Sequence, residues 1–93
     1  MALFLIIALK DSAKRVGPEI EEKFPSKHYK IDDTKWFVQS KLPTAKAVSD
    51  YVGITSDDPK ASESTGIVVN VKGYFGRGPA DMWEWIATQS VEQ

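Results

Sequence analysis

The chain has 93 residues, 42% of them hydrophobic and 27% charged, which predicts a single globular domain over residues 1–93. Its 12 basic and 13 acidic residues give a net charge of −1, so the totals lack the concentrated positive charge of non-specific nucleic-acid binders. The absence of cysteine excludes disulfides, thiolate metal sites and cysteine nucleophiles.

No stretch of the sequence approaches the roughly 20 apolar residues of a membrane span. The apolar run at the N-terminus lacks a basic start and meets Lys10 and Asp11 at once, unlike a signal peptide. We therefore expect a soluble, cytoplasmic protein that does not associate with membranes.

Residues 2–9 form an uninterrupted apolar run. In a strand, Phe4 and Ile6 would face one side of the sheet, and Leu5 and Ile7 the other. Such a run is typical of an interior strand that is covered on both faces. One layer of helices covers only one face, so the second cover must be the C-terminal helix or another copy of the chain.

The segment after this strand has apolar residues at helical spacing, and Asp11 or Ser12 is placed to cap a helix. Pro18 interrupts the pattern, and a proline inside a helix costs about 3 kcal/mol, whereas the first helical position accepts it. We predict a short turn at 11–16 and a helix from Pro18 to about Lys23. The alternative is one continuous, kinked helix.

Strand-forming residues fill 28–32 and 35–40, and the polar residues between them predict a hairpin. The next predicted helix has Thr44 as its N-cap and Gly53 at its end. Its apolar residues recur at helical spacing, which predicts a buried stripe.

Residues 55–66 contain almost nothing apolar and predict a solvated loop that connects two elements. A β-branched run at 67–71 predicts a strand that could continue toward Tyr74. A glycine-rich turn at 73–79 then leads into a last helix at 79–90.

The predicted order is strand, helix, strand, strand, helix, strand, followed by an added C-terminal helix. This is the ferredoxin-like α+β arrangement, in which two helices cover one face of a four-stranded antiparallel sheet. The other face stays open unless the C-terminal helix folds across it or a second subunit covers it.

Gly76, Arg77 and Gly78 precede the last helix, where backbone N–H groups and the guanidinium could contact an anion. The segment matches neither the P-loop nor the dinucleotide-binding pattern. A sharp exit from the preceding strand explains the glycines equally well.

Two acidic pairs, Asp32–Asp33 and Asp57–Asp58, could each contact a divalent ion, but neither has a third ligand nearby in the sequence. His28 is the only histidine, so a transition-metal site has no second imidazole or thiolate. We predict no catalytic residue, no metal site and no cofactor.

Four aromatic residues near the C-terminus, Tyr74, Phe75, Trp83 and Trp85, are candidates for a partner interface. Trp83 and Trp85 project in different directions from a helix, so one could enter the core while the other meets a partner. The alternative is that both indole rings lie over the open face of the sheet.

The segment Lys-Ile-Asp-Asp-Thr-Lys-Trp-Phe-Val-Gln-Ser-Lys-Leu-Pro-Thr, residues 30–44, resembles small ferredoxin-like proteins that are distantly similar to the CRISPR-adaptation endonuclease-like family. The resemblance covers roughly residues 1–72 and implies dimers that share strand edges and sheets. In nuclease members an aspartate at the end of the first strand would bind metal at the dimer interface. Here Ala8, Leu9 and Lys10 occupy that place and Asp11 follows, so the resemblance implies fold and dimerisation rather than nuclease chemistry.

These observations favour a non-enzymatic, homodimeric module for protein interaction or regulation. The alternative is a nucleic-acid-binding or metal-dependent nuclease-like protein that would use Asp11 with a divalent ion, or Arg77 on phosphates. A small-molecule sensor with a pocket between sheet and helices is a third hypothesis, for which the sequence names no ligand.

Overall fold

Strands and helices follow one another in the order β-α-β-β-α-β-α in this computed structural model, which describes residues 2–55 and 64–91. The elements are β1 (Ala2–Ala8), α1 (Ala13–Lys23), β2 (His28–Asp32), β3 (Lys35–Ser40), α2 (Ala45–Tyr51), β4 (Gly66–Asn70) and α3 (Ala80–Val91). The chain therefore has the α+β class that the sequence predicts.

The apolar strand β1 lies inside a four-stranded sheet with the order β2-β3-β1-β4. It pairs antiparallel with β3 on one side and with β4 on the other, and β2 pairs antiparallel with β3. The prediction that residues 2–9 form an interior strand is confirmed, although the strand itself ends at Ala8.

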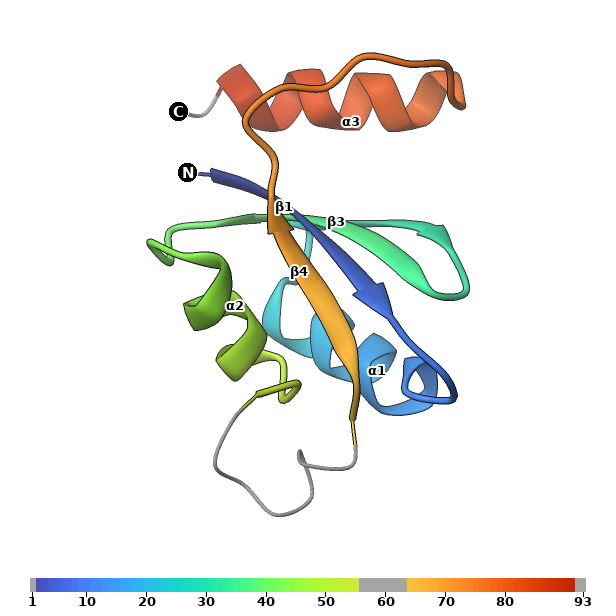
Figure 1. Ribbon diagram of the computed structural model, residues 1–93. Coiled ribbons are helices and arrows are strands. Elements are labelled where there is room, and N and C mark those ends of the chain that lie inside the picture. The colour runs from blue at the N-terminus through green and yellow to red at the C-terminus, as the bar shows by residue number, and fades with distance from the viewer. Residues whose placement is uncertain (1, 56–63, 92–93) are drawn as a thin grey trace.

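Helices α1 and α2 lie on one side of the sheet, and α3 lies on the other (Figure 1). The main core fills the space between the sheet and the first two helices. Its largest fully buried side chains are those of Phe4, Ile6, Val16, Ile20, Trp36, Val38, Val48 and Val52. The Nζ of Lys23 donates a hydrogen bond to the carbonyl of Tyr51 at 2.6 Å, which links α1 to the end of α2.

A second, smaller core lies between α3 and the opposite face of the sheet. Leu3 from β1 meets Met82 and Ile86 from α3, and all three side chains are buried. Partly buried apolar residues pack around them: Tyr29, Ile31, Phe37, Val71, Trp83 and Trp85. The C-terminal helix therefore covers part of the second face of the sheet.

The predicted break before Pro18 is wrong, because α1 runs without interruption from Ala13 to Lys23 with the proline inside it. Tertiary packing outweighs the lost hydrogen bond, since the helix buries its apolar face against the sheet. Gly17 lets the helix approach closely: a Cβ at this position would lie 3.2 Å from Cζ2 of Trp36. Ser12 occupies the N-cap position, but its side chain makes no capping hydrogen bond.

Helix α2 has the ends that the sequence predicts. The Thr44 hydroxyl accepts a hydrogen bond from the N–H of Ala47 at 3.0 Å, as an N-cap does. Gly53 follows the helix with a φ of 87°, a left-handed conformation that glycine adopts without steric cost. Most of the loop predicted at 55–66, residues 56–63, lies outside the described residues.

Gly66 starts β4 at a place where the backbone of β1 comes close. A Cβ there would lie 2.8 Å from the carbonyl oxygen of Ile7, whereas a Cβ at Gly73 would meet nothing within 4 Å. We expect Gly66→Ala to lower the free energy of unfolding by about 1–3 kcal/mol, because the two strands must separate. Gly73→Ala, the matched control, should change it by less than about 0.5 kcal/mol. Urea unfolding followed by circular dichroism measures both, and equal midpoints would contradict the prediction.

Candidate interaction surface

Three of the four aromatic residues singled out near the C-terminus make ring contacts within the chain. The ring of Tyr74 stacks on Trp83 with centroids 6.0 Å apart and an interplanar angle of 21°. Trp85 packs against Tyr29 of β2, also at 6.0 Å, with the rings tilted by 41°. Both tryptophans are half-buried, while Phe75 is fully exposed. Of the four, Phe75 is the side chain whose whole ring is exposed to solvent.

Helix α3 is anchored by its aliphatic residues rather than by an inserted indole. Met82 and Ile86 of α3 are both buried against the sheet. Beside them, the hydroxyl of Tyr29 donates a hydrogen bond to Oδ2 of Asp81 at 2.7 Å. That hydrogen bond, followed by desolvation and by the charge of the carboxylate, raises the pKa of Tyr29 above its usual value. The same hydrogen bond joins β2 to the first turn of α3.

An apolar strip remains uncovered on the face of the sheet that carries α3. Leu5 and Ile7 of β1 are half-buried, and their partners in β4 are Val69 and Ile67. Ile67 is 49% exposed and Val69 is 42% exposed. We call Leu5, Ile7, Ile67 and Val69 the open strip. Contiguous exposed aliphatic residues of this kind are typical of an interaction surface.

Only part of the open strip could be predicted from the sequence. The two-sided apolar pattern of residues 2–9 predicts that this face needs a cover, but the exposure of Ile67 and Val69 could not be read from their own segment. A β-branched run has the same appearance whether its second face is buried or open.

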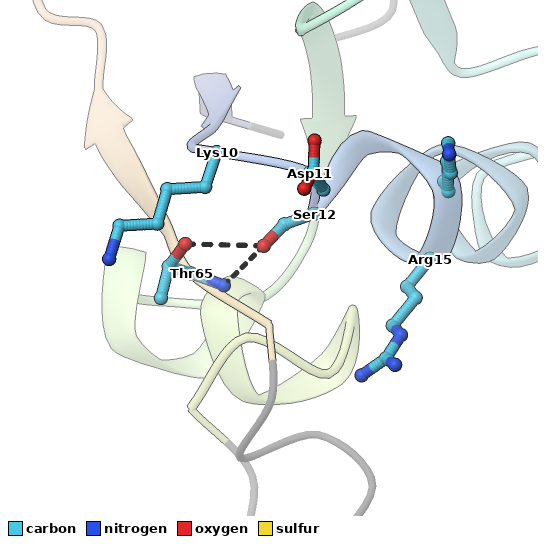
Figure 2. A pocket seen from close by; sticks show the side chains of 6 residues that line it. Lys10, Asp11, Ser12, Arg15 and Thr65 are labelled. Carbon is cyan, nitrogen blue, oxygen red and sulfur yellow. Dashed lines mark hydrogen bonds between the residues drawn. The ribbon is translucent and has the colours of Figure 1, made fainter.

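A basic pocket of about 410 Å³ lies where β1 leads into α1 (Figure 2). Lys10, Lys14 and Arg15 line it together with Asp11, Ser12 and Thr65. The Ser12 hydroxyl accepts a hydrogen bond from the N–H of Thr65 at 2.7 Å, and Lys10 and Arg15 extend on either side of this pair. Asp11, which the alternative hypothesis assigns to a divalent ion, thus lies in a pocket that three basic side chains line.

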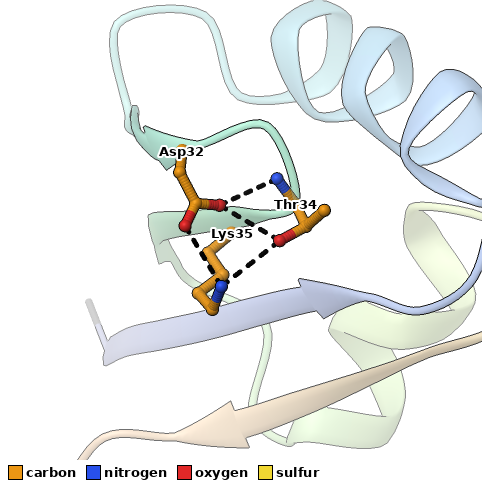
Figure 3. Close-up of polar contacts among 3 residues, drawn as sticks. All are labelled: Asp32, Thr34 and Lys35. Atoms are coloured by element: carbon orange, nitrogen blue, oxygen red, sulfur yellow. Dashed lines mark hydrogen bonds and ion pairs between the residues drawn. The ribbon is translucent and has the colours of Figure 1, made fainter.

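Asp32 belongs to the turn between β2 and β3 (Figure 3). Its Oδ1 accepts hydrogen bonds from the N–H and the hydroxyl of Thr34 at 2.9 and 3.1 Å, and its Oδ2 lies 3.1 Å from the Nζ of Lys35. The bond from the Thr34 backbone, followed by that from Lys35, lowers the pKa of Asp32. This carboxylate therefore shapes the hairpin.

The other polar candidates also have local roles. Nδ1 of His28 lies 2.7 Å from the carbonyl oxygen of Phe24, which is hydrogen-bonding distance. Gly76 and Arg77 are exposed in the linker that joins β4 to α3, where the anion contact remains a prediction. Gly78 sits against α3, since a Cβ at this position would lie 2.6 Å from Cε of Met82.

Within residues 2–55 and 64–91, no three His, Cys, Asp or Glu side chains gather as a metal site would require. The acidic pair at 57 and 58 lies outside this range. None of the helices in the same range is both long and apolar enough to span a bilayer. Searches with protein-family models and against curated proteins gave no match to this chain. Its function is therefore inferred from its surface.

Acid should weaken the hairpin turn through Asp32. A carboxyl whose pKa is lowered by folding stabilises the native state above the unfolded pKa of about 4, and this contribution disappears as the pH falls through the lower, folded value. We expect Asp32→Asn to destabilise the protein at pH 7 and to differ less from the wild type at pH 2–3. Urea unfolding across this pH range measures the difference. Asp33→Asn is the matched control, because that side chain is 99% exposed, and it should follow the wild type throughout.

Ile86→Asp should release α3 while the main core stays folded. Ile86 is 2% exposed between α3 and the sheet, and a carboxylate buried there would lack a partner of opposite charge among the described residues around it. We expect at least tenfold faster amide hydrogen exchange in α3 and a red shift of the tryptophan fluorescence. Ala87→Asp, at the exposed neighbouring position, should leave both unchanged. Slow exchange of α3 in Ile86→Asp would show that Ile86 does not anchor the helix.

Proposed function

We propose that the protein is a non-enzymatic interaction module that acts as a homodimer, with the open strip as its self-association surface. The observation that carries this proposal is the exposure of Ile67 and Val69 directly beside Leu5 and Ile7. Four aliphatic side chains then form one patch on a single face of the sheet, next to a helix that stops short of covering them.

We also propose that the fold is ferredoxin-like. The strand order β2-β3-β1-β4 and the antiparallel pairing of all neighbours support this assignment. So does the position of α1 and α2 on one side of the sheet (Figure 1). In this arrangement the second face of the sheet is the natural place for a partner, and α3 takes up only part of it.

The polar residues support a binding role better than catalysis. The side chains of Ser12, His28 and Asp32 are each engaged in contacts that shape the chain. A catalytic group needs a proton or a lone pair that can be directed at a substrate. A partner of a different kind could still use Phe75, which projects fully from the linker.

The self-association can be measured by sedimentation equilibrium at micromolar concentrations. We expect the wild type to form dimers and Ile67→Lys to raise the dissociation constant at least tenfold, which corresponds to about 1.4 kcal/mol. The reason is that a charged group would enter an interface whose other members are aliphatic.

Phe75→Lys adds the same charge at another exposed apolar residue and is the matched control, since it should leave the dissociation constant unchanged. A wild-type protein that stays monomeric at several hundred micromolar would overturn the proposed dimer. A loss of dimers in Phe75→Lys but not in Ile67→Lys would move the interface to the linker.

A further inference from the structure

The two edges of the sheet differ in their protection against pairing with another strand. At the β2 edge, Lys30 and Asp32 carry charges, and the register of β2 against β3 shifts between these two residues. Charged side chains and irregular pairing are the features by which natural sheets prevent edge-to-edge association. The β2 edge is therefore unsuited to pairing with a further strand.

The β4 edge has none of these features. Its sequence, Gly-Ile-Val-Val-Asn, contains no charge and no proline. Its pairing with β1 runs without a register shift from Phe4↔Asn70 to Ala8↔Gly66. On the outer side of β4 no further strand of the described chain continues the sheet. An uncharged, regular and partly apolar edge of this kind is a template for a further strand.

The hydrogen bonds at the two ends of the β1–β4 ladder show which backbone groups point outward. Val71 N–H donates to Leu3 at 2.9 Å, and Leu9 N–H donates to Thr65 at 3.0 Å. Because hydrogen-bonded pairs alternate along antiparallel strands, Ile67 and Val69 also direct their N–H and C=O groups toward β1. The backbone groups of Val68, and of the residues two positions away from it, then point toward the free edge.

We propose that the homodimer forms by antiparallel pairing of β4 with β4 of a second copy, about a two-fold axis at Val68. This inference rests on the proposed function and names its interface. In this register Val68 faces its own counterpart and exchanges hydrogen bonds with it. Ile67 of each copy then lies directly opposite Val69 of the other copy, on the face that carries the open strip.

This register matches the exposed side chains with one another. Ile67 and Val69 are the two exposed residues of β4 on that face, and each gains the other as its cross-strand neighbour. The open strips of the two copies become continuous across the axis. Because β4 carries no charge, no like charges meet at the centre of the interface. A shift of the axis to Val69 would instead set Ile67 opposite Val71, which already packs beside α3.

The absence of cysteine from the chain allows a direct test by disulfide cross-linking. In the proposed register, Cys at 67 and Cys at 69 of the other copy would have Cα atoms about 4.5 Å apart, within disulfide range. The same position in the two copies would be diagonal, about 7–8 Å apart and out of range. An equimolar mixture of Ile67→Cys and Val69→Cys should therefore cross-link at least tenfold faster under mild oxidation than either variant alone. Phe75→Cys mixed with Ile67→Cys controls for random collision.

Each outcome has a distinct meaning when sedimentation of the same variants under reducing conditions accompanies it. Fast cross-linking of Val69→Cys alone, or of Ile67→Cys alone, would place the axis elsewhere and overturn the register. Dimers that sediment as such but do not cross-link would overturn edge pairing and leave the proposed homodimer intact, as in face-to-face stacking with sheets about 10 Å apart. Monomers in sedimentation would overturn both proposals.

Discussion

The fold depends on the need to shield β1 from water on both faces of the sheet. Phe4 and Ile6 lie in the main core under α1 and α2, and their exposed fractions are zero. Leu3, Leu5 and Ile7 point to the opposite face and require a cover of their own. A small chain has few elements for this purpose, and of the three helices among residues 2–55 and 64–91, two serve the first face. The third of these helices, α3, supplies part of the second cover.

Helix α3 covers one end of the second face and leaves the rest to solvent. It buries Leu3 near the start of β1 and packs beside Phe37 of β3, whereas Leu5, the cross-strand partner of Phe37, and Ile7 stay half-buried. A single helix is about 10 Å wide, so it cannot cover a four-stranded sheet along the whole length of its strands. The structure therefore shows α3 as the cover of part of this face, and a second subunit is our proposal for the remainder.

The sequence predicts features that neighbouring residues determine and misses those that distant contacts determine. Thr44 and Gly53 mark the ends of α2 through local capping, and the two-sided apolar run predicts an interior strand. Pro18 leads to the wrong prediction of a helix break, because the packing of α1 on Trp36 outweighs the local preference of proline against helix interiors. The exposure of Ile67 depends on the path of α3, a segment that begins 13 residues later at Ala80. No pattern within β4 contains that information.

The difference between the two sheet edges suggests a reason for the exposure of the aliphatic residues Ile67 and Val69. Lys30 and Asp32 at the β2 edge show that this chain uses charge and irregular pairing where a strand must remain alone. One Lys in place of Ile67 would protect the β4 edge in the same way, at little cost in a side chain that is half in solvent. A strand that a partner covers must instead remain regular, uncharged and apolar on the contacting face. β4 meets these three requirements, and the difference between the edges therefore argues for association at β4 rather than for incomplete burial.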